Sequence, residues 1–169
     1  MGTEIVYLSL GSNIGDRESN LAQATMALSL NINIMDLISS SYYKSEPLYN
    51  KKQPDFLNSV VKFKTSLKPF DVLDVIQNVE TMLGRPKIRK KNKPRIIDID
   101  ILFYGKSFIE TEKLTIPHPM LSLRKFILIP FAEIEPNFQI PNSHITINNL
   151  IENCPDHSMV QRHLMDTQA

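Results

Sequence analysis

Two aspartates, Asp98 and Asp100, lie two positions apart in the apolar stretch IIDIDILFY at residues 96–104. The isoleucine-rich composition predicts a strand. Because successive side chains of a strand point to opposite faces, both carboxylates should share one face, and the isoleucines at 97, 99 and 101 should share the other with Phe103. We expect the isoleucine face to pack against helices and the aspartate face to be open.

Two carboxylates this close repel each other unless a cation lies between them. Mg²⁺ in proteins is typically bound by one or two carboxylates together with phosphate groups of the substrate. The pattern D-x-D is common, however, and two solvated acids on an edge strand explain it equally well. Spacing alone therefore leaves the metal site and the solvated pair as open alternatives.

A basic run, RPKIRKKNKPR, occupies residues 85–95 directly before the aspartate strand, and seven of its eleven residues are lysine or arginine. Most charge runs are solvated loops. Here the run enters the strand that carries the carboxylates, and cations beside metal-binding acids are typical of polyphosphate sites. The chain lacks the motif G-x-x-x-x-G-K-[ST], so a Walker-type phosphate loop is excluded, and GSNIGD at residues 11–16 is interpreted as a turn with a helix cap.

Aromatic and amide side chains suggest a second kind of pocket. Phe56 and Asn58 lie at the start of a predicted strand, after a loop at residues 45–55 that is long enough to be functional. With Phe126, they could bind a flat heterocycle between two rings. Two core phenylalanines are the alternative that the sequence alone favours. His118, between two prolines, is interpreted as a hydrogen-bonded surface residue rather than a catalyst.

The remaining pattern predicts an α+β fold. Strands are expected at residues 5–10, 34–44, 57–65 and 96–104, and helices at residues 16–30 and 69–83. The order β-α-β-β-α-β is that of a ferredoxin-like core, with one antiparallel sheet and both helices on one face. A C-terminal hairpin and helices should complete it, including a short strand ending at Pro117 and an amphipathic helix in LRKFILIPFAEI.

Length and charge restrict the class of protein. The 169 residues predict a single domain, residues 1–169, and a net charge of +1 predicts no nucleic-acid or membrane partner. The single cysteine, Cys154, cannot form a disulfide framework and fits a cytoplasmic protein. An RNA-recognition domain shares the element order, but the chain lacks the aromatic RNP pattern.

Together these motifs resemble the 6-hydroxymethyl-7,8-dihydropterin pyrophosphokinase family of folate biosynthesis. The order and spacing agree over YLSLGSNIGDR, SEPL, QPDFLNSV, GRPK, PRIIDIDILFYG, LTIPHPML and RKFILIPFAEI. The resemblance implies transfer of the pyrophosphoryl group of ATP to the hydroxymethyl oxygen of the dihydropterin, with release of AMP. We expect the chain to act as a monomer. The resemblance also implies that Asp98 and Asp100 hold two Mg²⁺ ions. The intact set of acids and arginines argues against a ligand-binding relative without catalysis.

The resemblance further assigns residues to the two substrates. Its catalytic set is Arg85, Arg95, Asp98 and Asp100. Its ATP-binding set is Gln77, Glu80, Lys87, the backbone near Ile101, Lys113, Thr115, His118 and Arg124. Its pterin-binding set is Ser45, Leu48, Phe56, Asn58 and Phe126, with the two phenylalanines stacking on the ring.

Three departures from the family pattern involve four positions. Asn92 and Lys93 replace a tryptophan and a glycine that the family often has, Lys87 replaces an arginine, and Pro119 stands where some members have tyrosine. These departures imply differences in loop behaviour and rate rather than in identity.

Overall fold

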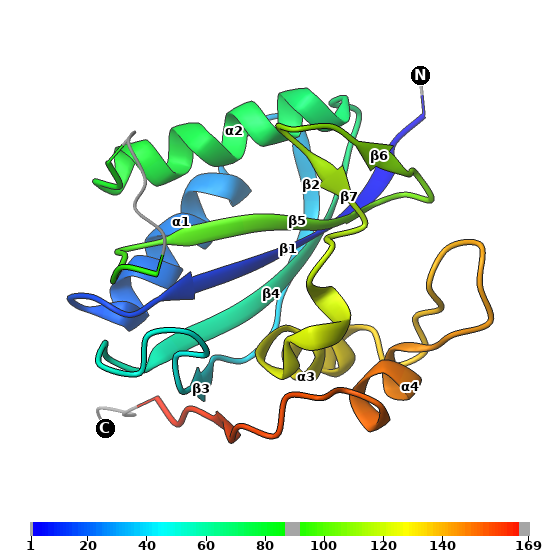
Figure 1. Cartoon of the computed structure of the whole chain (residues 1–169). Helices are drawn as coiled ribbons and strands as arrows, with labels where there is room; N and C mark the ends of the chain where they lie inside the picture. Colours follow the sequence, from blue (N-terminus) through cyan, green and yellow to red (C-terminus); the bar gives the residue numbers. More distant parts are fainter. Residues whose placement is uncertain (1, 87–91, 166–169) are drawn as a thin grey trace.

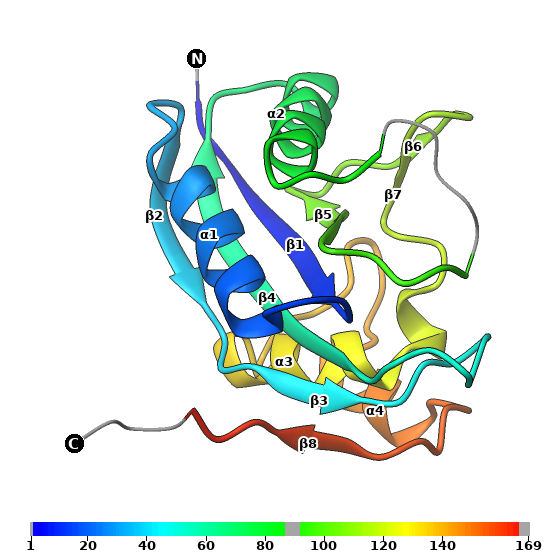
Figure 2. The same ribbon diagram turned by 90° about the vertical axis from the view of Figure 1, so that its left-hand side faces the viewer.

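An antiparallel sheet of six strands forms the centre of the fold, and helices cover both of its faces (Figures 1 and 2). The computed structural model describes residues 2–86 and 92–165. The strand order is β5-β1-β4-β3-β8, and β2 pairs with β4 as well. The strands are β1 (Glu4–Ser12), β2 (Ile34–Ser39), β3 (Tyr43–Ser45), β4 (Phe56–Thr65), β5 (Asp98–Tyr104) and β8 (Val160–Arg162).

Helices α1 (Arg17–Ser29) and α2 (Pro69–Met82) lie together on one face of the sheet (Figure 2). The Asp16 side chain caps α1 by accepting a hydrogen bond from the Ser19 backbone N–H at 3.0 Å, as the sequence predicted. Pro69 occupies the first turn of α2, and Gly84 follows that helix with a positive φ of 98°. Leucines of α1 and branched residues of α2 pack on the isoleucines of β5 and form the larger core cluster.

The opposite face carries the C-terminal elements (Figure 1). These are the short helix η1 (Leu121–Leu123), helix α3 (Lys125–Ile134) and helix α4 (Ile147–Glu152). A second core cluster lies between them and the sheet, with rings of Tyr7, Phe103, Phe131 and Phe138 in mutual contact. The predicted hairpin is formed by β6 (Ile109–Glu110) and β7 (Thr115–Ile116).

The prediction for Phe103 was wrong. The pairing of β1 with β5 shifts register between Tyr7 and Leu8, which pair with Phe103 and Ile101. The extra residue on β5 is Leu102, and a bulge of this kind breaks the alternation of side chains. Phe103 therefore joins the cluster on the aspartate side, while the isoleucines at 97, 99 and 101 pack against α1 and α2 as expected.

The predicted strand at residues 34–44 is divided into β2 and β3. At the break, the Ser40 backbone N–H donates to the Val60 carbonyl at 2.9 Å, and the Ser40 hydroxyl accepts from the Val60 N–H at 2.9 Å. The Ser41 backbone N–H donates a hydrogen bond to the Glu133 carboxylate instead, at 2.8 Å. Hydroxyl and carboxylate groups thus replace ladder partners and end the strand early.

The predicted helices and the strands at residues 5–10, 57–65 and 96–104 are confirmed within a few residues at their ends. Pro130 lies inside α3 without ending it. The sequence predicted C-terminal helices without locating α4, and it did not predict β8, which extends the sheet by pairing with β3. Of the helices in the described ranges, none has the length and apolar character needed to span a bilayer.

Candidate active site

A cavity of about 700 Å³ lies where the C-terminal end of β1 meets the first residues of β4 and β5. The connection between β3 and β4, the segment before α3 and the first turn of α3 (Lys125–Ile134) form most of its remaining wall. It is lined by Ser9, Leu10, Gly11, Glu46, Leu48, Tyr49, Gln53, Phe56, Asn58, Asn92, Arg95, Asp98, Asp100, His118, Met120, Arg124, Phe126 and Ile127. Nine of the residues assigned from the sequence are among them, so residues far apart along the chain meet in one place.

Both aspartates of β5 face this cavity, as the alternation of strand side chains predicted. Asp98 is paired with two arginines: its Oδ1 lies 2.5 Å from Arg85 Nη1, and its Oδ2 lies 3.0 Å from Arg95 Nη1. Charge-assisted hydrogen bonds of this kind are among the stronger polar contacts in proteins. The negative charge of Asp98 is therefore balanced by the protein itself.

Arg85 lies behind Asp98 rather than in the wall of the cavity. Only 9% of its side-chain surface is exposed, and its guanidinium also contacts the buried carboxylate of Glu80. Burial alone would lower the pKa of Arg85, but the charges of Asp98 and Glu80 outweigh it and raise the pKa. Arg85 is thus a permanently charged link between α2 and β5.

Asp100 has a different environment. Burial, followed by the charge of Asp98, raises the pKa of its carboxyl group to about 7, although Arg124 and Arg85 act in the opposite direction. His118 lies beside it, with Nε2 4.0 Å from Asp100 Oδ2. Burial and the charge of Arg124 lower the pKa of His118 to about 4, so this imidazole is neutral at pH 7. In the described residues, Asp100 therefore lacks the arginine salt bridges that Asp98 has.

The aromatic wall contains Phe56, Asn58 and Phe126, as expected, together with Leu48. The Asn58 side-chain amide is buried and donates to Ser45 Oγ at 2.7 Å and to the Tyr43 carbonyl at 3.2 Å. Ser45 therefore lies behind Asn58 and fixes its orientation. A Cβ atom at Gly11 would lie 3.3 Å from Asn58 Oδ1, so the close approach of β1 to this wall favours glycine there.

Each arginine of the cavity lies against an aromatic ring. The ζ carbon of Arg95 is 5.6 Å from the centre of the Phe56 ring, and that of Arg124 is 5.9 Å from the centre of the Phe126 ring. The Nε atoms of both arginines are buried and have no hydrogen-bond partner among the described residues. Positive charge is thus held beside the surfaces that could bind a planar ligand.

Several assigned ATP-side residues do not line the cavity. Gln77 and Lys113 are exposed, Thr115 belongs to β7, and the Ile101 side chain is buried in the larger core cluster. Lys87 falls outside the described residues.

Asn13, in the segment interpreted as a turn and cap, is a residue that the sequence analysis missed. It is 1% exposed, and its side-chain amide donates to Gln53 Oε1 at 3.0 Å and to the Pro54 carbonyl at 3.2 Å. Its Oδ1 accepts from the Arg95 backbone N–H at 2.8 Å. Asn13 therefore connects the β3–β4 segment to the approach to β5. Tyr49 and Gln53 were also missed, although the length of their loop had marked it as functional.

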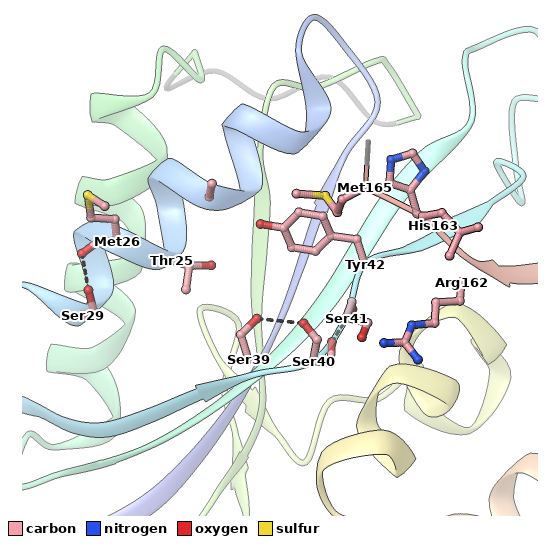
Figure 3. A pocket seen from close by; sticks show the side chains of 12 residues that line it. Thr25, Met26, Ser29, Ser39, Ser40, Ser41, Tyr42, Arg162, His163 and Met165 are labelled. Atoms are coloured by element: carbon pink, nitrogen blue, oxygen red, sulfur yellow. Dashed lines mark hydrogen bonds between the residues drawn. The ribbon is translucent and has the colours of Figure 1, made fainter. Parts of the chain in front are cut away.

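A second hollow, of about 660 Å³, lies between α1, the β2–β3 junction and the C-terminal segment (Figure 3). Figure 3 shows the Tyr42 ring directed toward Met165 and Thr25. His163 Nε2 lies 2.5 Å from Glu18 Oε1 and joins the C-terminal segment to α1. This hollow contains no residue assigned from the sequence and no pair of carboxylates, so the first cavity is the candidate active site.

The donor atoms of the first cavity fit a hard dication. In the part of the chain that the structure describes, no group of three or more histidine, cysteine, aspartate or glutamate residues could hold a metal ion by itself. Asp98 and Asp100 offer carboxylate oxygens, and 37% of the Asp100 side chain remains exposed. A pair of carboxylates completed by substrate oxygens is the arrangement typical of Mg²⁺.

Comparison with known proteins gives consistent results. Residues 7–136 match the model of the family described as 7,8-dihydro-6-hydroxymethylpterin-pyrophosphokinase (HPPK). The 2-amino-4-hydroxy-6-hydroxymethyldihydropteridine pyrophosphokinase of Haemophilus influenzae is 39% identical over 155 residues, which cover 92% of this chain and 96% of that enzyme. The enzyme of the same name from Bacillus subtilis is 44% identical over 77% of each chain.

Some relatives are much longer. The folic acid synthesis protein FOL1 of Dictyostelium discoideum is 41% identical over 92% of this chain, which spans only 23% of that protein. Among solved structures, wild-type HPPK-DHPS of Plasmodium falciparum with pteroate superposes with a TM-score of 0.69 at 19% identity, over 89% of this chain and 42% of that one. At this identity the likeness supports the fold alone.

Proposed function

This chain belongs to the 7,8-dihydro-6-hydroxymethylpterin-pyrophosphokinase family, and from that premise we propose that it transfers the pyrophosphoryl group of ATP to 6-hydroxymethyl-7,8-dihydropterin. One observation carries the proposal: a single cavity joins the two carboxylates of β5, two arginines and two phenylalanine rings. The carboxylates and arginines suit a triphosphate, and the rings with Asn58 suit a flat heterocycle.

In the proposed reaction, the hydroxymethyl oxygen of the pterin forms a bond to the β-phosphorus of ATP. The bond between that phosphorus and the oxygen bridging to the α-phosphate breaks, AMP leaves with the electron pair, and the hydroxyl proton is released. The protein chiefly orients the two substrates for in-line attack and balances the developing charge.

On the pterin side, we assign stacking to Phe56 and Phe126 and edge recognition to Asn58. Leu48 adds apolar contact, and Ser45 orients the Asn58 amide. On the phosphate side, Arg95 and Arg124 bind phosphate oxygens, while Arg85 holds Asp98 in place. His118, neutral at pH 7, accepts a hydrogen bond from the Met120 N–H at Nδ1, so its Nε2 carries the proton and can donate toward Asp100. Gln77, Glu80, Lys87, Lys113, Thr115 and the backbone near Ile101 remain predicted contacts to ATP.

We further propose that Asp98 and Asp100 hold two Mg²⁺ ions together with ATP. The raised pKa of Asp100 supports this, because a nearby cation would favour its charged form. When bound, the ions would neutralise charge on the phosphoryl oxygens. Asp98→Ala or Asp100→Ala should each lose several kcal/mol of transition-state stabilisation, on the order of a 10³-fold loss in kcat/KM. Near-normal turnover of either variant in saturating Mg²⁺ would contradict the metal assignment.

The test of the reaction is the identity of the nucleotide product. Purified chain, ATP, Mg²⁺ and 6-hydroxymethyl-7,8-dihydropterin should yield AMP in equal amount to the pterin diphosphate. Omission of the pterin or chelation of Mg²⁺ should stop AMP formation. Release of ADP instead would indicate an ordinary kinase and would refute the proposal.

We also propose a ferredoxin-like core for this chain. The strand order β5-β1-β4-β2, with α1 and α2 on one face of the sheet, supports such a core, to which β3, β8 and the C-terminal helices are added.

We also propose that the chain acts as a monomer, since every residue assigned to the site comes from one copy. A mass near 19.4 kDa by light scattering would agree with this, and twice that mass would not.

A further inference from the structure

Tyr49 lines the cavity, but neither the sequence motifs nor the proposed reaction assigns it a role. It lies in the connection between β3 and β4, and 56% of its surface is exposed. Its ring contacts the guanidinium of Arg124, which precedes α3: the ζ carbon lies 5.9 Å from the ring centre. The same carbon is 5.9 Å from the Phe126 ring centre. Rings from two separate segments thus contact one guanidinium.

Arg124 has few other partners. In the described ranges, its side chain makes no hydrogen bond or ion pair, and its Nε atom is buried. A guanidinium is usually held by a carboxylate or a carbonyl, which fixes its direction. Here the two aromatic faces are the contacts that restrict it, and the N–H groups of its two Nη atoms remain available to a ligand in the cavity that it lines.

The backbone on which Tyr49 is placed is well anchored. Asn50 forms a turn in which its Oδ1 accepts from the Lys52 N–H at 3.2 Å and its carbonyl accepts from the Gln53 N–H at 3.3 Å. Gln53 in turn accepts from the buried Asn13 at 3.0 Å. The Tyr49 hydroxyl itself makes no hydrogen bond in the part of the chain described. The ring is therefore directed at Arg124 by the turn and by contact with the cation.

We propose that Tyr49 is a positioning residue, which together with Phe126 holds the Arg124 guanidinium in place for the triphosphate of ATP. The inference rests on the proposed function for the identity of the ligand. A cation–π contact at a partly exposed site contributes about 0.5–1.5 kcal/mol, which corresponds to a change of about 2- to 10-fold in affinity. We expect this change in the interaction with ATP and not in that with the pterin.

The first experiment compares three variants by AMP release in Mg²⁺ buffer. Tyr49→Ala should raise the KM for ATP about 2- to 10-fold and leave the KM for the pterin unchanged. Tyr49→Phe keeps the ring and should match the wild type. Phe108→Ala is the matched control, because Phe108 is 57% exposed and lies outside the cavity lining. An unchanged KM for ATP in Tyr49→Ala, or an equal loss in Tyr49→Phe, would overturn the proposal.

A double-mutant cycle with Arg124→Ala separates positioning from a merely structural role. If Tyr49 acts through Arg124, the loss caused by Tyr49→Ala should disappear in the Arg124→Ala background. The same loss in both backgrounds would overturn the proposal. Because Tyr49 is largely exposed, the melting temperature of Tyr49→Ala should equal that of the wild type, and a large decrease would count against positioning.

A binding measurement keeps this inference separate from the reaction itself. The chain contains no tryptophan, so Tyr49→Trp introduces a single indole whose emission should change on titration with ATP. Calorimetric titration with ATP compares the wild type with Tyr49→Ala directly. If the wild type releases no AMP but the ATP affinity of Tyr49→Ala is lower than that of the wild type, the proposed reaction fails and the positioning role stands. If AMP is released and the indole does not respond to ATP, the positioning role fails and the reaction stands.

Discussion

Replacing Asp100 with asparagine should stabilise the folded chain above pH 7 and, at the same time, remove its activity. The pKa of Asp100 rises from 3.8 to about 7 on folding, first because of burial and then because of the Asp98 charge. A carboxyl group with a raised pKa binds its proton more tightly in the folded state. Its ionisation therefore destabilises the fold increasingly as the pH rises from about 4 to about 7, and by a constant amount above that.

The size of the effect follows from the same values. The difference between 3.8 and about 7 corresponds to about 4 kcal/mol at about 1.4 kcal/mol per pH unit. Because 37% of the Asp100 side chain is exposed, water screens part of this interaction, and we expect about 1–2 kcal/mol. Asparagine has nearly the same shape and cannot ionise, so Asp100→Asn should recover that amount.

The assay is urea unfolding of wild type and Asp100→Asn at pH 4.5, 6 and 8, with a chelator to exclude divalent ions. The stability difference should be small at pH 4.5 and reach about 1–2 kcal/mol in favour of the variant at pH 8. Asp98→Asn is the matched control with the opposite sign: Arg85 and Arg95 lose a charged partner, which should cost about 1–3 kcal/mol. The reasoning is refuted if Asp100→Asn is less stable than wild type at pH 8, or if its gain does not depend on pH.

Three further predictions test other parts of the structure. Phe56→Ala should raise the KM for the pterin about 10-fold and that for ATP much less; equal losses in steady-state kinetics would argue against stacking. Asn13→Ala should lose about 1–3 kcal/mol in urea unfolding, since it leaves buried hydrogen-bond partners unpaired, and a variant as stable as the wild type would contradict this. Glu135→Gln should lose about 1 kcal/mol at pH 7. Burial alone would raise the pKa of Glu135, but hydrogen bonds from Lys62 and Tyr7 and the Lys62 charge lower it. The stability difference between Glu135→Gln and the wild type should therefore disappear as the pH falls through that lowered pKa. A stability difference that stays constant with pH would exclude the ionic contribution.

Local patterns predicted the elements well where one face of each element is apolar. The helix predicted at residues 69–83 and the cap at Asp16 each reflect contacts within a few residues. The shared face of Asp98 and Asp100 followed from the same alternation. These features can be predicted from a sequence because the spacing of apolar residues along a single helix or strand reflects which of its faces is buried.

Features that depend on a partner strand or a distant segment could not be predicted in this way. The bulge that turns Phe103 to the aspartate side arises from the register between β1 and β5, which composition does not encode. The break at Ser40 depends on the hydroxyl reaching Val60. Asn13 was interpreted as a turn residue, because its hydrogen-bond partners Gln53 and Arg95 lie 40 and 82 positions away and leave no local sequence pattern.

The two carboxylates of β5 are equivalent in the sequence and different in the structure. Two arginines balance Asp98, whereas the neighbour of Asp100 is a histidine whose pKa is lowered to about 4. A strand that carried both acids for stability alone would pair both of them. Ionisation of Asp100, whose pKa is raised despite the charges of Arg124 and Arg85, destabilises the fold, and a bound cation would offset that cost. The free energy of folding that is lost when Asp100 ionises would therefore be recovered when Mg²⁺ and the phosphates of ATP bind beside it.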